Sequence, residues 1–135
     1  MVLAAKRPVD GSFRVGTDVV ELPRLRAHIL RHGTALLGRL FTRAEVAAAE
    51  AAGVDVIAVL GAALAIKKAF LGVIDADGRI PLTEIEVTMD GGTWSAIHLH
   101  GVARARAAAQ GLTLADLATA RSGHVATATV IVRAD

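Results

Sequence analysis

The sequence has no cysteine and no tyrosine, and it contains only one tryptophan and three phenylalanines in 135 residues. The lack of cysteine excludes disulfides, thiolate metal sites and a cysteine nucleophile. Because aromatic residues make up 3% of the chain and hydrophobic residues 53%, the interior must be built from alanine, valine, leucine and isoleucine. A chain of this length is expected to form one domain whose core needs no covalent staple.

Basic residues are in slight excess but never form a long run. The sequence has 15 lysines and arginines against 13 acidic residues, a formal charge of +2, and no run of five basic residues. Such an excess suits an acidic protein, a phosphate ligand or nucleic acid. Because the few aromatic residues leave no stacking platform for bases, we expect no nucleic-acid partner, and a basic nucleic-acid-binding module stays only as an alternative.

The sequence also lacks a long apolar run that is free of charge. Its most apolar stretch, residues 56–74, contains Lys67 and Lys68. A lysine at the centre of a bilayer costs about 2.5–3.5 kcal/mol on insertion scales, so the stretch favours a helix inside a soluble fold. Residues 1–12 carry no long apolar core and predict a flexible N-terminal arm rather than a signal peptide. We therefore expect a cytoplasmic protein with no membrane contact.

Hydrophobic patterning predicts one α+β domain over residues 13–135. The expected elements are a strand over residues 13–20, a helix from Pro23 to Gly33, a short helix from a capping box at residues 42–45 to Gly53, a long apolar helix over about residues 54–74, a turn at 75–78, a hairpin with strands around 85–87 and 94–99, a helix over 102–110 and a closing strand over 125–132. This order predicts an antiparallel sheet wrapped on one long central helix.

Few residues in this pattern carry recognisable chemistry, and generic nucleotide-binding and hydrolase motifs are absent. Asp18 ends the first predicted strand, where carboxylates often hold Mg²⁺ against phosphates, although on its own a helix-start cap is the commoner reason for such a residue. Lys67 and Lys68 point about 100° apart on a helix, so both can reach one rim of a polar cleft, or snorkel to solvent. His98 and His100 point to one face of a strand, but no third metal ligand is evident nearby.

Three segments in chain order resemble motifs of a known family. Residues 14–25 (RVGTDVVELPRL) are similar to the G-x-D-[IV]-x-E-[ILV]-x-R opening of the holo-acyl-carrier-protein synthases. Residues 40–45 (LFTRAE) are similar to their T-x-x-E helix start, and residues 64–70 (LAIKKAF) to their F-A-A-K-E-A-[FL] helix. The similarity covers about residues 13–133. It implies the 4′-phosphopantetheinyl transferase fold, assembled as a homotrimer with clefts between subunits.

The resemblance also implies ligands and partners. Members of the family transfer 4′-phosphopantetheine from coenzyme A to a serine of acyl carrier protein, which places the chain in fatty-acid or polyketide biosynthesis. Asp18 matches an aspartate that binds Mg²⁺, and Lys67 matches the lysine of the K-E pair, which makes it a candidate cofactor-binding residue. Arg24 matches an arginine that docks the carrier protein, and Arg26 and Arg31 of the same predicted helix are expected to join it.

The sequence departs from the family where relatives hold the metal. The metal-binding glutamate is Lys68 here, and the family's histidine falls within residues 118–121 (ATAR), which contain none. At 4 Å two unit charges interact by about 4 kcal/mol at an effective dielectric near 20, and a divalent ion doubles this, so an ammonium repels Mg²⁺ strongly. We expect no metal site of the family type, with Asp18 as the single contact if a metal binds. Lys68 is left to pair with Asp18 or to donate to a phosphate.

Two functions compete on this basis. We favour a divergent relative that binds coenzyme A or the pantetheine arm of a carrier protein. In it, Mg²⁺-dependent transfer is lost or replaced by other thioester chemistry, with Asp18 and Lys68 as the catalytic acid or base. The alternative is an active 4′-phosphopantetheinyl transferase that modifies acyl carrier protein, with Lys68 supplying part of the metal's charge.

Overall fold

The computed structural model describes residues 12–74 and 80–134. The elements are, in order, β1 (Ser12–Glu21), α1 (Leu22–Leu40), α2 (Arg43–Ala51), α3 (Val56–Leu71), the short 3-10 helix η1 (Leu82–Glu84), β2 (Ile85–Asp90), β3 (Thr93–Leu99), α4 (Gly101–Ala109), β4 (Leu112–Arg121) and β5 (Val125–Ala134). The predicted turn at 75–78 and all but the last residue of the predicted N-terminal arm lie outside the described residues. That last residue, Ser12, already belongs to β1.

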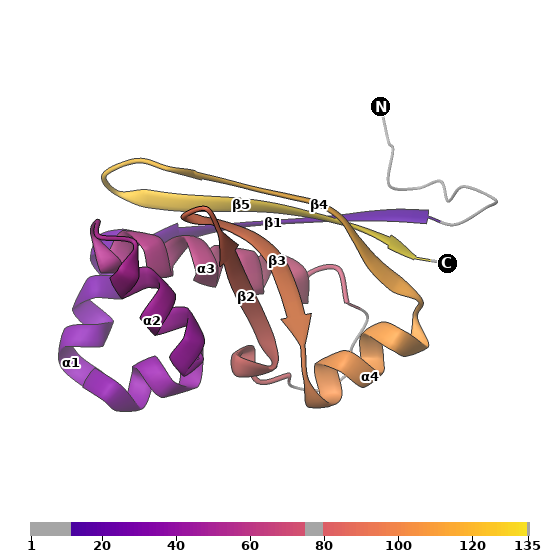
Figure 1. Cartoon of the computed structure of the whole chain (residues 1–135), viewed down its shortest axis with the longest axis horizontal. Helices are drawn as coiled ribbons and strands as arrows, with labels where there is room; N and C mark the ends of the chain where they lie inside the picture. The colour runs from indigo at the N-terminus through magenta and orange to yellow at the C-terminus, as the bar shows by residue number, and fades with distance from the viewer. Residues whose placement is uncertain (1–11, 75–79, 135) are drawn as a thin grey trace.

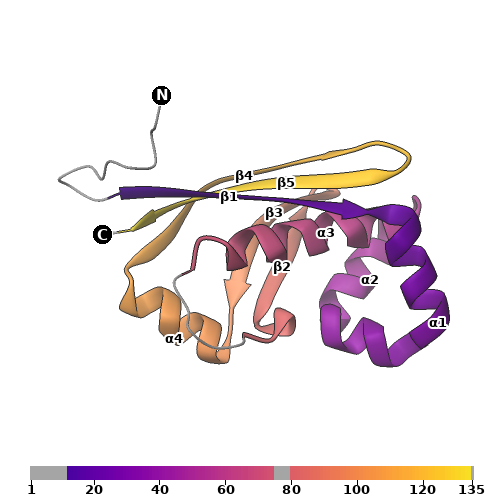
Figure 2. The ribbon, with the colours of Figure 1, turned by 180° about the vertical axis from the view of Figure 1, so that it is seen from behind.

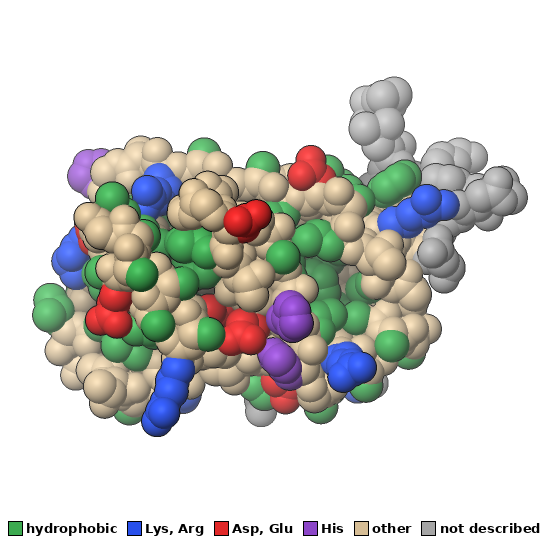
Figure 3. Space-filling view, in the orientation of Figure 1, with side chains coloured by type: hydrophobic (Ala, Val, Ile, Leu, Met, Phe, Trp, Pro, Cys, Tyr) green, Lys and Arg blue, Asp and Glu red, His purple; other side chains and the backbone are tan. Residues whose placement is uncertain are grey.

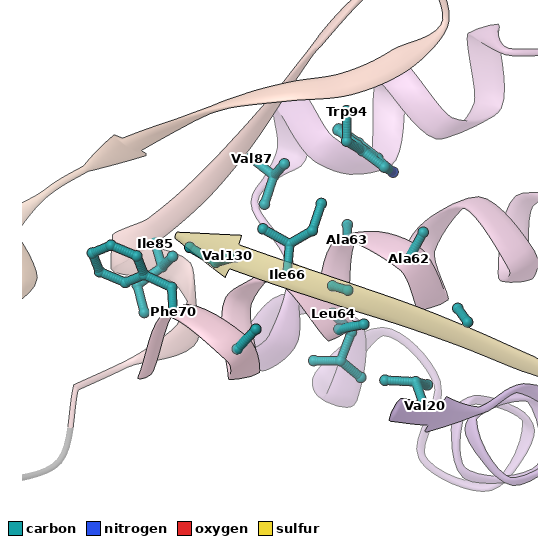
Figure 4. Packing of buried hydrophobic residues seen from close by; sticks show 14 of the residues in the cluster. Val20, Ala62, Ala63, Leu64, Ile66, Phe70, Ile85, Val87, Trp94 and Val130 are labelled. Carbon is teal, nitrogen blue, oxygen red and sulfur yellow. The ribbon is translucent and has the colours of Figure 1, made fainter. Parts of the chain in front are cut away.

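The apolar helix α3 forms the centre of the fold. An antiparallel three-stranded sheet of order β1-β5-β4 covers one side of it, and the β2–β3 hairpin packs on another side (Figures 1 and 2). Nearly every α3 side chain from Val59 to Phe70 is buried, and the exception is Lys68. Figure 4 shows Ile66 and Phe70 of α3 among buried residues of the hairpin and of β5. The predicted α+β class with a central helix is confirmed.

Glycine brings β1 unusually close to α3. A Cβ atom at Gly16 would lie 2.0 Å from the backbone oxygen of Ala69, so no other residue fits there without moving the strand. Asp18 follows Gly16 by two residues and therefore points to the same side of the strand. The close approach sets the Asp18 carboxylate beside α3, next to Lys68.

The hairpin, α4 and the last strand lie where the sequence predicts them. Gly91 and Gly92 both have positive φ, 61° and 81°, which a tight hairpin turn requires. One strand was missed: β4 pairs along its length with β5 and forms an edge of the main sheet. The predicted end of the first helix at Gly33 was only partly right. Gly33 (φ 59°, ψ −141°) breaks the helical geometry, but helical turns resume after it and continue to Leu40.

The outer face of the three-stranded sheet has no covering layer within the described chain. Phe13, Val15 and Val19 of β1 are 59%, 61% and 55% exposed. They alternate with residues that face α3, as the period of a strand requires. The sheet therefore presents an apolar surface to solvent in a single copy of the chain.

Candidate functional site

A cleft of about 500 Å³ opens between α1 and α3, beside the end of β1. Its volume lies in the range typical of small-molecule sites. Most of its wall is made of leucine and valine side chains. The polar residues that line it are Glu21, Arg24, His28 and Lys68. The cleft can therefore accept a ligand with an anionic group and an apolar segment.

Helical spacing explains how these polar groups meet. Arg24 and His28 are four residues apart on α1, so both lie on the helix face that borders the cleft. Lys68 approaches from α3, one turn after Leu64, which also lines the cleft. Arg24 lies 3.9 Å from Glu21, and both side chains are mostly exposed, so this ion pair adds little stability. The Arg24 guanidinium is available to an incoming anion.

Lys68 and Asp18 form an ion pair at the edge of this cleft. Lys68 Nζ lies 3.3 Å from Asp18 Oδ2, and the two side chains are 47% and 28% exposed. Asp18 Oδ2 itself is buried, yet it accepts no hydrogen bond from the described residues. The ammonium group thus neutralises a carboxylate oxygen without completing a hydrogen bond to it. The ion pair with Asp18 is one of the two roles that the sequence left open for Lys68, and donation to a phosphate stays a prediction.

The energy of the Lys68–Asp18 ion pair indicates that stabilising the fold is not its main role. At 3.3 Å the gross attraction is about 5 kcal/mol for an effective dielectric near 20. Desolvation and side-chain ordering offset most of that, and pairs this exposed contribute about 0–1 kcal/mol. The contribution to folding is therefore small. The effect on ligand binding is larger, because the Lys68 ammonium places a positive charge beside the Asp18 carboxylate at the edge of the cleft.

Lys67 takes the opposite direction into the protein interior. It is fully buried, and its Nζ lies 2.6 Å from Glu45 Oε1, 2.7 Å from Leu40 O and 3.1 Å from Leu82 O. Its three N–H groups are therefore used by the protein. Burial lowers the pKa of Lys67, and the Glu45 carboxylate opposes that shift.

The expectation that both lysines reach one rim is wrong, because the ~100° between adjacent helical positions turns Lys67 inward and Lys68 outward. In this structure Lys67 has no proton to offer a ligand. Its predicted role in cofactor binding stays a prediction, and this geometry does not favour it.

Glu45 is the centre of a buried polar network that sequence reasoning identified only as a helix cap. The predicted capping box is confirmed: Thr42 Oγ1 accepts from the Glu45 N–H at 3.2 Å, and Glu45 Oε1 accepts from the Thr42 N–H at 2.8 Å. The same carboxylate also holds Lys67, and its second oxygen accepts from the Val87 N–H of β2 at 2.7 Å. One side chain thus joins α2, α3 and the hairpin, and only the T-x-x-E pattern signalled it.

The network reaches the surface through Glu86. Thr42 Oγ1 donates to Glu86 Oε2 at 2.6 Å, and His100 Nε2 lies 3.1 Å from Glu86 Oε1. The Thr42 hydrogen bond is the main cause that lowers the pKa of Glu86, and His100 adds to it. His98 and His100 lie side by side, with ring centroids 6.1 Å apart. Figure 3 shows histidine side chains next to acidic ones on this face.

A magnesium site of the family type does not fit the residues present. Within residues 12–74 and 80–134 no group of three or more histidine, aspartate or glutamate side chains is placed to hold a metal ion. Asp18 is a single carboxylate, and its buried oxygen already faces the Lys68 ammonium. A divalent cation there would have to displace that ammonium or lie against it, which like charges disfavour.

The three arginines proposed for docking do not form one patch. Arg24 lines the cleft, whereas Arg26 bonds Asp55 Oδ2 at 3.0 Å on another side of α1. Asp55 also caps the start of α3, and the Arg26 hydrogen bond lowers its pKa. Arg31 is exposed near the middle of α1. The structure thus brings together Arg24 and Lys68 and leaves Arg26 engaged elsewhere.

Fold and cleft together define an α+β protein that presents an anion-accepting cleft between its first and third helices. Over 118 residues the chain is 36% identical to the holo-[acyl-carrier-protein] synthase of Solidesulfovibrio magneticus. The aligned region covers 87% of this chain and 95% of the relative. The chain belongs to the holo-acyl-carrier-protein synthase family. No protein-family model matches it.

Solved structures support the same fold. The apo-ACPS structure from Chronobacterium is 26% identical, with a TM-score of 0.76 over 93% of this chain and 99% of the other. The ACPS–CoA complex of Chronobacterium ammoniagenes is 24% identical, with a TM-score of 0.80 over 92% of this chain and 98% of the other. The predicted 4′-phosphopantetheinyl transferase fold is therefore confirmed.

In the described part of the chain, no helix combines the length and hydrophobicity that crossing a bilayer requires.

Proposed function

We propose that this chain is a divergent holo-acyl-carrier-protein-synthase-like protein of fatty-acid or polyketide biosynthesis in the cytoplasm. It binds coenzyme A, or the pantetheine arm of a carrier protein, in the cleft between α1 and α3. Mg²⁺-dependent phosphopantetheinyl transfer is lost or replaced by other thioester chemistry. The observation that carries this proposal is the Lys68–Asp18 ion pair, which puts a cation where the family resemblance implies a metal-binding glutamate.

Coenzyme A binding is supported by the chemistry of the cleft. Arg24 and Lys68 offer two positive groups for phosphate oxygens, and the leucine-rich wall suits the less polar pantetheine arm. A structural neighbour with the same fold is a coenzyme A complex. If thioester chemistry remains, Lys68 is the group best placed to act on the ligand, and Asp18 orients it.

Docking of acyl carrier protein is supported by the arginines of α1. Carrier-protein recognition by this family rests on acidic partners, and Arg24 and Arg31 are exposed on that helix. Arg26 is half-exposed and tied to Asp55, so its contribution requires that this hydrogen bond open. We therefore assign the main docking role to Arg24 and Arg31.

Assembly as a homotrimer is supported by the uncovered sheet face. Phe13, Val15 and Val19 would remain in water in a single copy, and exposed apolar patches of this kind usually mark an interface. Burying them against neighbouring copies would also bring a second chain close to the cleft, since Val19 lies both on that face and in the cleft wall. Completion of the cleft by a neighbour is part of this proposal.

An active phosphopantetheinyl transferase is the second candidate. It is favoured by one observation, the 36% identity to a holo-acyl-carrier-protein synthase across 95% of that relative. In this case the Lys68 ammonium would take over part of the electrostatic role of the metal ion.

One experiment separates the two candidates. The protein is incubated with coenzyme A, Mg²⁺ and several apo carrier proteins, and each carrier is weighed by mass spectrometry, with the Solidesulfovibrio relative as positive control. Calorimetric titration with coenzyme A is run in parallel. We expect coenzyme A to bind and the carriers to keep their mass. A gain of phosphopantetheine would establish the second candidate, and no binding of coenzyme A or carrier at millimolar concentration would overturn the proposal.

A further inference from the structure

We infer that Lys68 supplies, as a fixed part of the chain, the positive charge that the phosphates of the ligand meet, so that coenzyme A binds without a divalent metal ion. The inference rests on the proposed function, because it concerns the same cleft. It adds that the Lys68 ammonium holds the phosphate and that the solution need not contain a divalent metal ion. The positive charge of this site then belongs to one residue, which can be substituted.

The ammonium group of Lys68 lies where a metal ion would have to bind. Lys68 Nζ lies 3.3 Å from Oδ2 of Asp18, which is the buried side-chain oxygen that lacks a hydrogen bond among the described residues. A buried carboxylate oxygen without a hydrogen-bond donor needs a cation nearby. The chain itself provides that cation. A metal ion bound to this carboxylate would lie close to the ammonium, which like charges disfavour.

The ammonium group of Lys68 is still able to donate hydrogen bonds to a ligand. An ammonium group has three N–H donors, and the ammonium of Lys68 donates no hydrogen bond within residues 12–74 and 80–134. Its side chain is about half exposed and lines the cleft. Lys68 can therefore remain beside Asp18 and donate to a phosphate oxygen at the same time. The ammonium then bridges the Asp18 carboxylate and the phosphate, as a metal ion shared between the two groups would.

Lys67, the neighbouring lysine, cannot supply this charge. That neighbouring lysine has the same charge and the same helix, but it is fully buried and its three donors are used by Glu45 and two carbonyl groups. Arg24 adds a second positive group to the cleft next to Lys68. The charge available to an anion in this region therefore comes from Arg24 of α1 and from Lys68 of α3.

The test is calorimetric titration of coenzyme A into the full-length protein, once in EDTA and once in saturating Mg²⁺. We expect dissociation constants that agree within about twofold, since no metal contributes to binding. The Lys68→Gln variant, which keeps similar size without charge, should bind about 10- to 100-fold more weakly in both buffers. Lys68→Glu should bind poorly in EDTA and recover in Mg²⁺, because it restores a second carboxylate beside Asp18.

Direct metal binding gives a readout independent of coenzyme A. Mn²⁺ titration followed by electron paramagnetic resonance should show no bound ion for the wild-type protein and a bound ion for Lys68→Glu. Coenzyme A binding that requires Mg²⁺ in the wild type would overturn this inference and leave the proposed function standing. Equal binding by wild type and Lys68→Gln would also overturn it. No coenzyme A binding in either buffer would overturn this inference, and titration with carrier proteins would then decide whether the proposed function stands.

Discussion

Replacing Lys67 with methionine tests whether the buried lysine is structural. Methionine has nearly the same length and fills the same space, so the main loss is the charge. The variant leaves the Glu45 carboxylate buried with two backbone N–H donors, at 2.8 and 2.7 Å, and no cation. It also leaves the carbonyl oxygens of Leu40 and Leu82 without the N–H groups that now lie 2.7 and 3.1 Å away. Removing one partner of a buried ion pair costs about 3–5 kcal/mol, a large share of the free energy of unfolding of a typical domain.

The matched control is Lys68→Met at the adjacent position. Lys68 is 47% exposed and its partner Asp18 is 28% exposed, so solvent screens this ion pair in part and its loss should cost less stability than the loss of the fully buried Lys67. Urea unfolding followed by tryptophan fluorescence measures both, because Trp94 is the only tryptophan, is buried and donates its indole N–H to Val59 O at 2.9 Å. Glu45→Gln and the double variant with Lys67→Met complete a double-mutant cycle. We expect the double variant to lose less stability than the sum of the single variants.

The reasoning fails if Lys67→Met and Lys68→Met lose the same stability, or if the cycle shows no coupling between Glu45 and Lys67. Either result would mean that the interior lysine is neutral or solvated in solution. In that case Lys67 would again become a candidate for cofactor binding.

Three further outcomes follow from other contacts. Gly16→Ala should lower the free energy of unfolding by at least about 1–3 kcal/mol, because its Cβ would lie 2.0 Å from Ala69 O, whereas Gly123→Ala, with open space around it, should lose far less in the same urea titration. The folded-state pKa of Glu86 is lowered, so its carboxylate stabilises the fold above its ordinary pKa of about 4.3, and this stability is lost as the pH falls through the folded value. The stability difference between wild type and Glu86→Gln should therefore shrink on acidification, and a constant difference from neutral to acid pH would contradict the assignment. Val15→Glu puts a charge on the uncovered sheet face and should convert a trimer into monomers. Size-exclusion chromatography with light scattering measures the oligomeric state, and a wild type that is already monomeric would refute the proposed assembly.

Much of the fold could be predicted because its strongest signals are local. The apolar run predicted α3, and the structure shortens it by placing Asp55 at its N-cap, where Oδ1 accepts from two backbone N–H groups. Adjacent glycines predicted the hairpin, and T-x-x-E predicted the start of α2. β4 could not be found in the same way. It is an edge strand whose side chains are mostly exposed and whose register shifts between Leu114 and Asp116, so its sequence alternates poorly and backbone pairing with β5 defines it.

The site was predicted in composition but not in geometry. Asp18 and Lys68 were expected to meet or to share a ligand, and the structure shows the ion pair. A sequence cannot tell which of two adjacent helical lysines faces inward, because that choice depends on the Glu45 carboxylate, which lies more than 20 residues earlier in the chain. The sequence placed Glu86 in the predicted strand around residues 85–87 and gave no sign of its contact with Thr42. Its link to Thr42 joins residues 44 positions apart, and no local pattern records such a contact.

The central claim is that a lysine occupies the place of the metal ion, and a crystal structure with coenzyme A and Mn²⁺ tests it most directly. Anomalous scattering locates manganese without ambiguity. The account predicts Lys68 Nζ within hydrogen-bond distance of a phosphate oxygen, Asp18 still beside it, and no manganese peak at that carboxylate. Manganese coordinated by Asp18, with the Lys68 side chain turned away from the phosphates, would contradict it.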